Sequence, residues 1–251
     1  MSEVDSAELA AELEGLRVLQ ATAPPGPPSP ALLASVQRMR PVRTRVPLRT
    51  LLVVAAAAVV FPTAAVAIYP LRRDLGALPP LWFAAVAVAW LAGFLIPLSA
   101  ALLPRPGQVL PDGARARRAA ILASLTLVLV GLLFTVDAPG VTILPATRWA
   151  GFGHLWWHCI SFSFKVSIPA VLVGAVALRK LASGAAHLAR LGAAIGAAGG
   201  ALSGLTLHGL CPYGGAAHVG LAHGGGVVIG ALIGALWLPL VAGIAGRAGR
   251  P

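Results

Sequence analysis

Long apolar segments alternate with short polar loops along most of this chain. Each segment is close to the ~20 consecutive apolar residues that carry an α-helix across ~30 Å of hydrocarbon. The pattern therefore predicts an all-α, polytopic membrane protein with six transmembrane helices. We expect the six spans at residues 50–69, 80–103, 119–136, 156–178, 191–210 and 224–246.

The first 46 residues form a separate module, so we expect two domains, 1–46 and 47–251. Apolar residues recur at helical spacing within residues 6–20, which predicts an amphipathic helix. A proline-rich linker, ATAPPGPPSP, separates it from a second short helix, ALLASVQRMR. Two such helices cannot bury a core of their own, so the module is either a solvated tail or a segment that folds onto a partner. The side chains expected to touch a partner are Leu9, Leu13, Leu16, Leu32, Leu33 and Val36.

Composition supports the membrane interpretation and limits what the positive charge means. The 251 residues are 58% hydrophobic and only 11% charged, with a net charge of +11. A soluble domain carries about a quarter charged residues. The basic residues are therefore orientation signals and contacts to lipid headgroups, and nucleic-acid binding is not expected.

The distribution of Arg and Lys predicts the orientation. Basic residues cluster before the first span, between the second and third, between the fourth and fifth, and after the sixth, whereas the opposite face has only Arg72, Arg73 and Arg148. The positive-inside rule then places both termini in the cytoplasm. The N-terminus is acidic and amphipathic, unlike a signal peptide, so the first span is expected to serve as an uncleaved anchor.

Glycines repeat every four residues in the fifth and sixth predicted spans. Gly192, Gly196, Gly200 and Gly204 form one row, and Gly226, Gly230 and Gly234 form another. Small residues at this spacing let two helix backbones approach closely. We expect these two helices to form a tight pair, with His208 and His223 carried towards a shared outer vestibule.

Nearly all the soft-ligand side chains lie beside two spans, at ends predicted to share the outer face. They are His154, His158, Cys159, His208, Cys211, His218 and His223. Three interpretations remain open: a disulfide, a metal ion such as zinc or cadmium bound by thiolate and imidazole, or small apolar cysteines with interfacial histidines. The spacings match no fixed zinc-finger pattern. Lys165 lies on the same predicted helical face as His154 and His158, further into the membrane span. Its side chain could snorkel, line a polar cavity or repel cations.

Enzymatic chemistry is not expected. The only carboxylates after residue 14 are Asp74, Asp112 and Asp137, each in or near a loop. No paired acids lie within a span, and no nucleotide-binding, zinc-protease or serine-hydrolase motif stands in a supporting context.

The chain resembles the NrsF-like anti-sigma factors, bacterial inner-membrane negative regulators of extracytoplasmic-function (ECF) sigma factors. The resemblance covers most of the membrane region. It rests on the six-span architecture, on Cys159 and Cys211 about fifty residues apart, and on LHGLCP at 207–212. It implies that the N-terminal segment holds a sigma factor inactive at the inner membrane. It also implies that Cys159 and Cys211 sense heavy metal or oxidant in the periplasm, with the histidines as accessory ligands or as neighbours that tune the pKa of the thiols.

Other classes remain as alternatives. A transporter of metal ions or small solutes is the main one, and it predicts polar residues facing inward at mid-membrane. A membrane redox protein that handles thiols or haem, and a structural assembly subunit, are two more.

Overall fold

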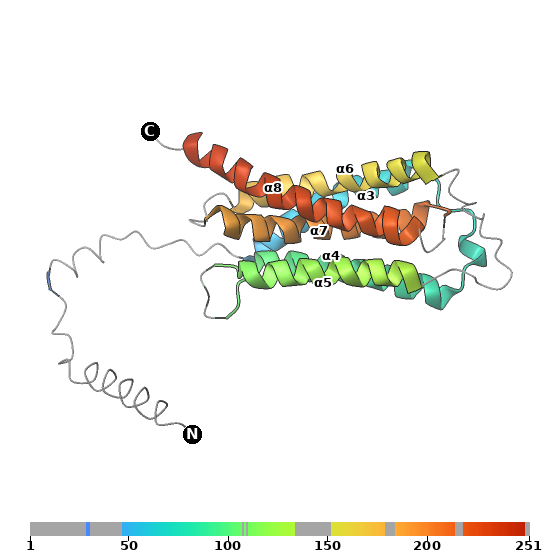
Figure 1. Cartoon of the computed structure of the whole chain (residues 1–251), viewed down its shortest axis with the longest axis horizontal. Coiled ribbons are helices and arrows are strands. Elements are labelled where there is room, and N and C mark those ends of the chain that lie inside the picture. The colour runs from blue at the N-terminus through green and yellow to red at the C-terminus, as the bar shows by residue number, and fades with distance from the viewer. Residues whose placement is uncertain are drawn as a thin grey trace, which may run out of the picture. The chain divides into compact units, whose positions relative to one another are not determined.

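The computed structural model describes residues 29–30, 47–106, 108, 110–133, 152–178, 184–213 and 218–248. The N-terminal segment 1–46 lies outside the described residues except for Ser29 and Pro30, so its predicted helices and partner contacts stay predictions. The described secondary structure is entirely helical (Figure 1). The long helices are α3 (Pro47–Ile68), α4 (Pro80–Leu102), α5 (Gly113–Leu133), α6 (Phe152–Leu178), α7 (Ala185–Leu210) and α8 (Gly224–Ala248). The described residues also include two short turns, η1 (Leu75–Ala77) and η2 (His218–His223).

Each predicted span corresponds to one long helix, which confirms the all-helical fold class. Five of the helices, α3, α4, α6, α7 and α8, are long and apolar enough to cross a membrane within the described residues. The sixth, α5, begins at Gly113, before the predicted span, because the Asp112 carboxylate accepts hydrogen bonds from the backbone N–H groups of Ala114 and Arg115. That α5 also crosses the membrane remains a prediction.

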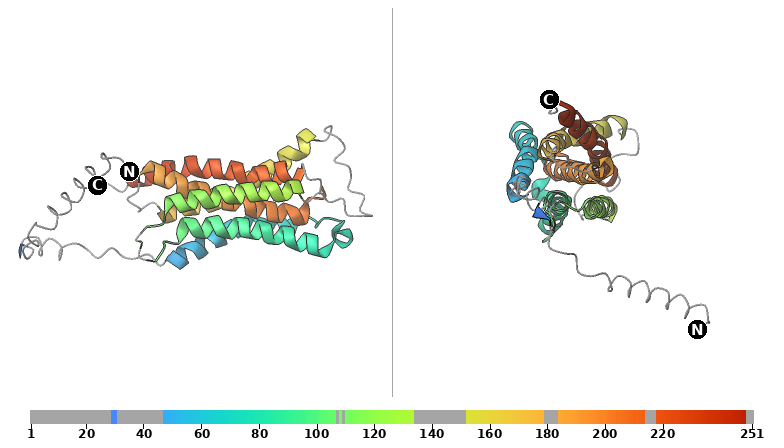
Figure 2. Two further views of the ribbon diagram at one scale, coloured as in Figure 1. Left: turned by 60° about the horizontal axis from the view of Figure 1, so that its bottom comes forward. Right: turned by 90° about the vertical axis from the view of Figure 1, so that its left-hand side faces the viewer.

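The outer surface of the bundle is apolar, as contact with lipid requires. Val60, Leu81 and Leu232 are 65%, 87% and 60% exposed. A soluble monomer rarely presents contiguous apolar patches on this scale. By contrast, α7 occupies the centre of the bundle. In its most apolar stretch 78% of the residues are buried, against 22–44% in the corresponding stretches of the other four membrane-length helices. Figure 2 shows α7 (orange) packed among α4, α6 and α8.

The predicted tight pairing of the fifth and sixth spans is confirmed. A Cβ built on Gly196 would lie 1.8 Å from the carbonyl oxygen of Gly230, and one on Gly192 would lie 2.0 Å from that of Gly234. Gly200 meets the Gly226 carbonyl in the same way, at 2.5 Å. The backbones of α7 and α8 therefore touch where any larger residue would push them apart.

The two ends of the bundle differ in character. At one end, which we call the cysteine end, Cys159 and Cys211 lie near the loop that joins α3 to α4, because the backbone N–H of Arg72 donates to the carbonyl of Gly209. At the other, the basic end, the starts of α5 and α7 meet at Gly113 and His187. The basic end carries Arg49, Arg105, Arg115, Arg117, Arg118 and Arg190 among the described residues.

Candidate metal centre

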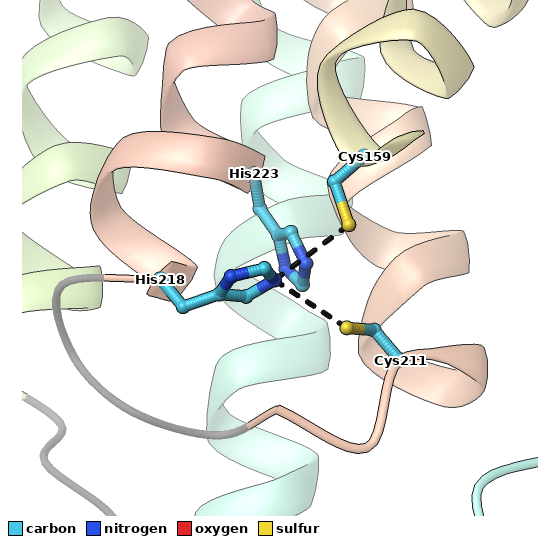
Figure 3. A group of neighbouring side chains, drawn as sticks. All are labelled: Cys159, Cys211, His218 and His223. Carbon is cyan, nitrogen blue, oxygen red and sulfur yellow. Dashed lines mark hydrogen bonds between the residues drawn. The ribbon is translucent and has the colours of Figure 1, made fainter. Parts of the chain in front are cut away.

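Four of the seven predicted ligands converge at the cysteine end. The ligand atoms of Cys159, Cys211, His218 and His223 all lie within 4.8 Å of one another, and all four side chains are buried. Both cysteines are free thiols in the structure. Figure 3 shows both imidazoles directed towards the two sulfurs. The group thus combines two thiols and two imidazoles, the ligand types that zinc and other soft or borderline metal ions prefer.

Three elements contribute these side chains. Cys159 lies in the second turn of α6, Cys211 directly follows the last residue of α7, and both histidines belong to η2. η2 is a π-helical turn, which pairs residue i with residue i+5. In an α-helix of 3.6 residues per turn, side chains five apart point about 140° away from each other. The wider turn brings His218 and His223 onto one side.

The two separations between His218 and the sulfurs match those of a tetrahedral zinc site. The Nε2 atom of His218 lies 3.6 Å from the Cys159 sulfur and 3.5 Å from the Cys211 sulfur. Zinc–sulfur bonds of about 2.3 Å and zinc–nitrogen bonds of about 2.05 Å in a tetrahedron separate the two ligand atoms by about 3.6 Å. Neither ring nitrogen of the buried His223 meets a hydrogen-bond partner among the described residues. A buried imidazole without a partner is costly, and a metal ion is one way to satisfy it.

Apolar and hydroxyl groups enclose the four ligands. Leu207, Ala222, Phe162 and Tyr213 pack against the cysteines. On the membrane side, the Ser163 hydroxyl donates to the carbonyl of Cys159 at 3.0 Å and lies 2.9 Å from the hydroxyl of Ser203 on α7. Burial excludes water and strengthens the electrostatic interaction of thiolates with a cation.

The environment favours a thiolate at Cys211. The neighbouring Cys159 thiol, aided by the His218 imidazole 3.5 Å from the Cys211 sulfur, outweighs burial and holds the pKa of Cys211 well below its ordinary value of 9.0. A thiolate is the form that binds metals and reacts with oxidants. The site is therefore suited to both kinds of signal.

The other three predicted ligands lie elsewhere. His208 stacks on Phe83 at 4.3 Å between ring centroids and lies 3.2 Å, through Nε2, from the Phe83 carbonyl oxygen. His158 is exposed on α6, and so is Lys165. His154 lies in the first turn of α6, and its side chain is outside the described set. The row of glycines on α7 explains the place of His208: Gly204, the last of the row, faces the ring of Trp90 on α4 instead of α8.

Sequence reasoning overlooked one residue at this end. The charge pattern treats Arg72 only as a charge on the sparsely basic face, yet its side chain is 3% exposed and makes a bidentate ion pair with Asp74, at 2.7 Å for both bonds. The signal was an RRD sequence within a short loop between two apolar spans. A charged side chain there needs a partner if it is buried.

The fold and site together define a class: an all-helical protein with membrane-length apolar helices and a buried pair of cysteines and histidines at one end. The family model described as NrsF, Negative regulator of sigma F, matches residues 35–242, which is most of the chain. The chain belongs to this family, and the resemblance drawn from its sequence is confirmed. No curated protein and no solved structure matches it.

The family match begins after most of the residues that we expect to contact a partner protein. It begins at residue 35, so it includes Val36, and it covers the helical bundle as far as residue 242 in α8. The predicted partner-binding residues Leu9, Leu13, Leu16, Leu32 and Leu33 precede it. Their role is an expectation from this chain's own sequence.

Proposed function

We propose that this protein is an anti-sigma factor of a bacterial inner membrane. It holds an ECF sigma factor inactive through residues 1–46 and releases it when a soft metal ion or an oxidant acts on Cys159 and Cys211. Both termini lie in the cytoplasm and the cysteine end faces the periplasm. The observation that carries this proposal is the convergence of Cys159, Cys211, His218 and His223 in a chain that belongs to a family of sigma-factor regulators.

Metal binding would use the four converging side chains. Cys159 and Cys211 would bind as thiolates and His218 and His223 as neutral imidazoles, so binding releases protons. The metal ion would tie the start of α6, the end of α7 and the start of α8 to one another. Because these elements are fixed by different helices, a change in their spacing shifts helices against one another.

Oxidation would act on the same two sulfurs. An oxidant that accepts two electrons would convert the thiols to a disulfide, with loss of two protons and formation of one S–S bond. The sulfurs lie within 4.8 Å of each other, so closure to the ~2.05 Å of a disulfide needs only a local shift. A bound metal ion and a disulfide exclude each other, because both use the same sulfurs.

The ligand can move the equilibrium between sigma-holding and sigma-releasing states only by its differential affinity for the two. We infer that the sigma-free state holds the four ligand atoms closer to their bound geometry. Metal at the cysteine end then favours release at the opposite end.

The test measures capture and release by the full-length protein. Detergent-purified protein is immobilised and incubated with a lysate of its source cells, and the sigma factor retained is identified by mass spectrometry. Deletion of residues 1–46 should abolish retention. Addition of Cd²⁺ should release the sigma factor from the wild type and not from a Cys159→Ser/Cys211→Ser variant, whereas a His158→Ala variant should behave as the wild type. Release from the double variant equal to that from the wild type overturns the sensing proposal, and Cd²⁺ uptake into sealed vesicles would support the transporter alternative.

A further inference from the structure

Arg72 ties the loop between α3 and α4 to the end of α7. Its backbone N–H donates to the carbonyl of Gly209 at 3.0 Å, and its guanidinium donates to the carbonyls of His208 at 3.4 Å and Pro212 at 3.5 Å. Asp74 holds the guanidinium in place from the other side. One side chain therefore joins the loop to the residues on both sides of Cys211. We call this set of contacts the Arg72 clasp.

The clasp supplies hydrogen-bond donors to backbone carbonyls at the C-terminal end of α7. The last four carbonyls of an α-helix have no partner within the helix, and the C-terminus of a helix favours a positive charge. Two of the carbonyls bonded by Arg72, those of His208 and Gly209, belong to the last turn of α7. The neighbouring Arg73 is exposed, so the burial of Arg72 reflects its own contacts and is not a general feature of the loop.

The same turn of α7 is also held against α4. The imidazole of His208 lies between Trp82 and Phe83, at ring-centroid distances of 5.3 and 4.3 Å. The end of α7 therefore has two attachments to the α3–α4 hairpin, one through the backbone at Arg72 and one through the ring of His208. If Cys211 moves along or around the α7 axis, the attachments at Arg72 and at His208 must either be distorted or move with it.

We propose that Arg72 is a positioning residue that couples the metal centre to α3, and so to the sigma-binding segment that precedes α3. This inference rests on the proposed function. Arg72 follows Ile68, the last residue of α3, by four positions, and residues 1–46 directly precede Pro47, the first residue of α3. Movement of Cys211 on metal binding passes through the clasp to the end of α3 and along α3 to its first residue, Pro47.

A second contact offers a competing route. Phe162 packs against the cysteines and lies 5.6 Å, between ring centroids, from Phe61 on α3. This contact is apolar and comes from α6, the helix that carries Cys159, whereas the clasp holds the end of α7 beside Cys211. Substitution separates the two routes, because Phe61 contacts Phe162 on α6, whereas Arg72 bonds to Asp74 and to the end of α7.

The experiment compares Arg72→Gln and Asp74→Asn with the matched control Arg73→Gln, all in the full-length protein. Cd²⁺ affinity is measured from thiolate-to-metal charge-transfer absorbance. Each measurement is made with and without the sigma factor that the full-length protein retains in the capture experiment. Coupling is reciprocal, so the sigma factor must weaken Cd²⁺ binding by the factor by which Cd²⁺ weakens sigma binding. We expect a factor of about 5 or more in the wild type and in Arg73→Gln. In Arg72→Gln, the Cd²⁺ affinity measured without sigma factor should stay within about threefold of the wild-type value. The ratio of Cd²⁺ affinities without and with sigma factor should fall to about two or less.

Hydrogen exchange of α3 supplies a readout that does not depend on the sigma factor. In the wild type, Cd²⁺ should change exchange around Cys211 and also in residues 47–79. In Arg72→Gln the change around Cys211 should persist and the change in residues 47–79 should vanish. In Asp74→Asn the change in residues 47–79 should be smaller than in the wild type. This pattern, together with the fall of the coupling factor towards unity, supports the clasp.

The outcomes distinguish the two proposals. Full coupling in Arg72→Gln, or loss of coupling only in Phe61→Ala, overturns the role of Arg72 and leaves the metal-sensing proposal standing. A wild type that shows no Cys-dependent Cd²⁺ absorbance, or that binds Cd²⁺ without any change in sigma affinity, overturns the proposed function itself.

Discussion

His218 holds the central position among the four converging side chains. Its Nε2 atom lies within 3.6 Å of both sulfurs, but a neutral imidazole nitrogen can donate only one hydrogen and so can serve one sulfur at a time. A cation at this point would interact with both thiolates at once. The arrangement is therefore better satisfied by a metal ion than by hydrogen bonds alone.

Replacement of His218 by Ala should weaken Cd²⁺ or Co²⁺ binding by about 100-fold or more. Loss of residues that only orient a ligand already costs about 10–100-fold, and His218 would be a ligand itself. Absorbance titration of the purified protein measures the affinity. The matched control is His158→Ala, an exposed histidine on α6 outside the converging set, which should change affinity by less than about threefold. Equal losses in both variants would show that the ligand set is wider than the four.

Asp74 should make the stability of the cysteine end depend on pH in the acid range. The hydrogen bonds and charge of Arg72 hold the pKa of Asp74 below its ordinary value of 3.8. A lowered folded pKa contributes stability that is fully present above about 3.8 and is lost as the pH falls through the folded value. Thermal unfolding measured from pH 6 to pH 3 (about three units) should show a steeper acid loss in the wild type than in Asp74→Asn. Parallel curves would mean that the ion pair adds no net stability.

At the scale of the helices, the close approach of α7 and α8 fixes the positions of the candidate metal ligands. Cys211 and the pair His218 and His223 lie at the adjoining ends of these two helices. The glycine rows leave no side chain between the backbones, so the register of α7 on α8 has little freedom. The rigid pair can therefore transmit movement over its length.

Gly196→Ala should destabilise the bundle by about 1–3 kcal/mol or more. The new Cβ would fall 1.8 Å from the carbonyl oxygen of Gly230, a backbone atom that no rotamer change can move, and forced overpacking has costs of this order. The matched control is Gly243→Ala on α8, where a Cβ meets nothing within 4 Å. Thermal unfolding in detergent, followed by circular dichroism, should show a lower midpoint for Gly196→Ala alone. An unchanged midpoint in that variant would indicate that α7 and α8 are not in contact at this point.

Sequence periodicity predicted these elements well because membrane helices are specified by local composition. The six segments became six helices, and the glycine rows identified the α7–α8 contact from spacing alone. The rows could not show that Gly204 turns to Trp90 and takes His208 away from the cysteines, because that depends on the position of α4. Nor could the sequence HVGLAH reveal a π-helical turn, which decides that His218 and His223 face the same way. Arg72 was missed for a similar reason, since its partners lie far along the chain at His208 and Pro212.

At the scale of the whole bundle, the cysteine end and the basic end present different surfaces. The cysteine end has the described basic residues Arg72 and Arg73, of which Arg72 is buried in an ion pair. The basic end carries several arginines on α3, α5 and α7 and in the α4–α5 loop. Basic residues are retained on the cytoplasmic side of membrane proteins. The asymmetry supports the proposed orientation, in which the candidate metal centre faces the periplasm.

Impermeant thiol labelling should reveal this orientation directly. In a Cys159→Ser/Cys211→Ser background, a single cysteine is introduced by Gly76→Cys in the α3–α4 loop or by Gln108→Cys in the α4–α5 loop. Both positions are exposed, and a Cβ at Gly76 meets nothing within 4 Å, so neither change should disturb the bundle. Whole cells treated with a charged maleimide should label Gly76→Cys at once and Gln108→Cys only after the inner membrane is permeabilised, because α4 separates the two loops by the thickness of the bilayer. The reverse pattern would place the metal centre in the cytoplasm, and labelling of both positions in intact cells would show that α4 does not span the membrane.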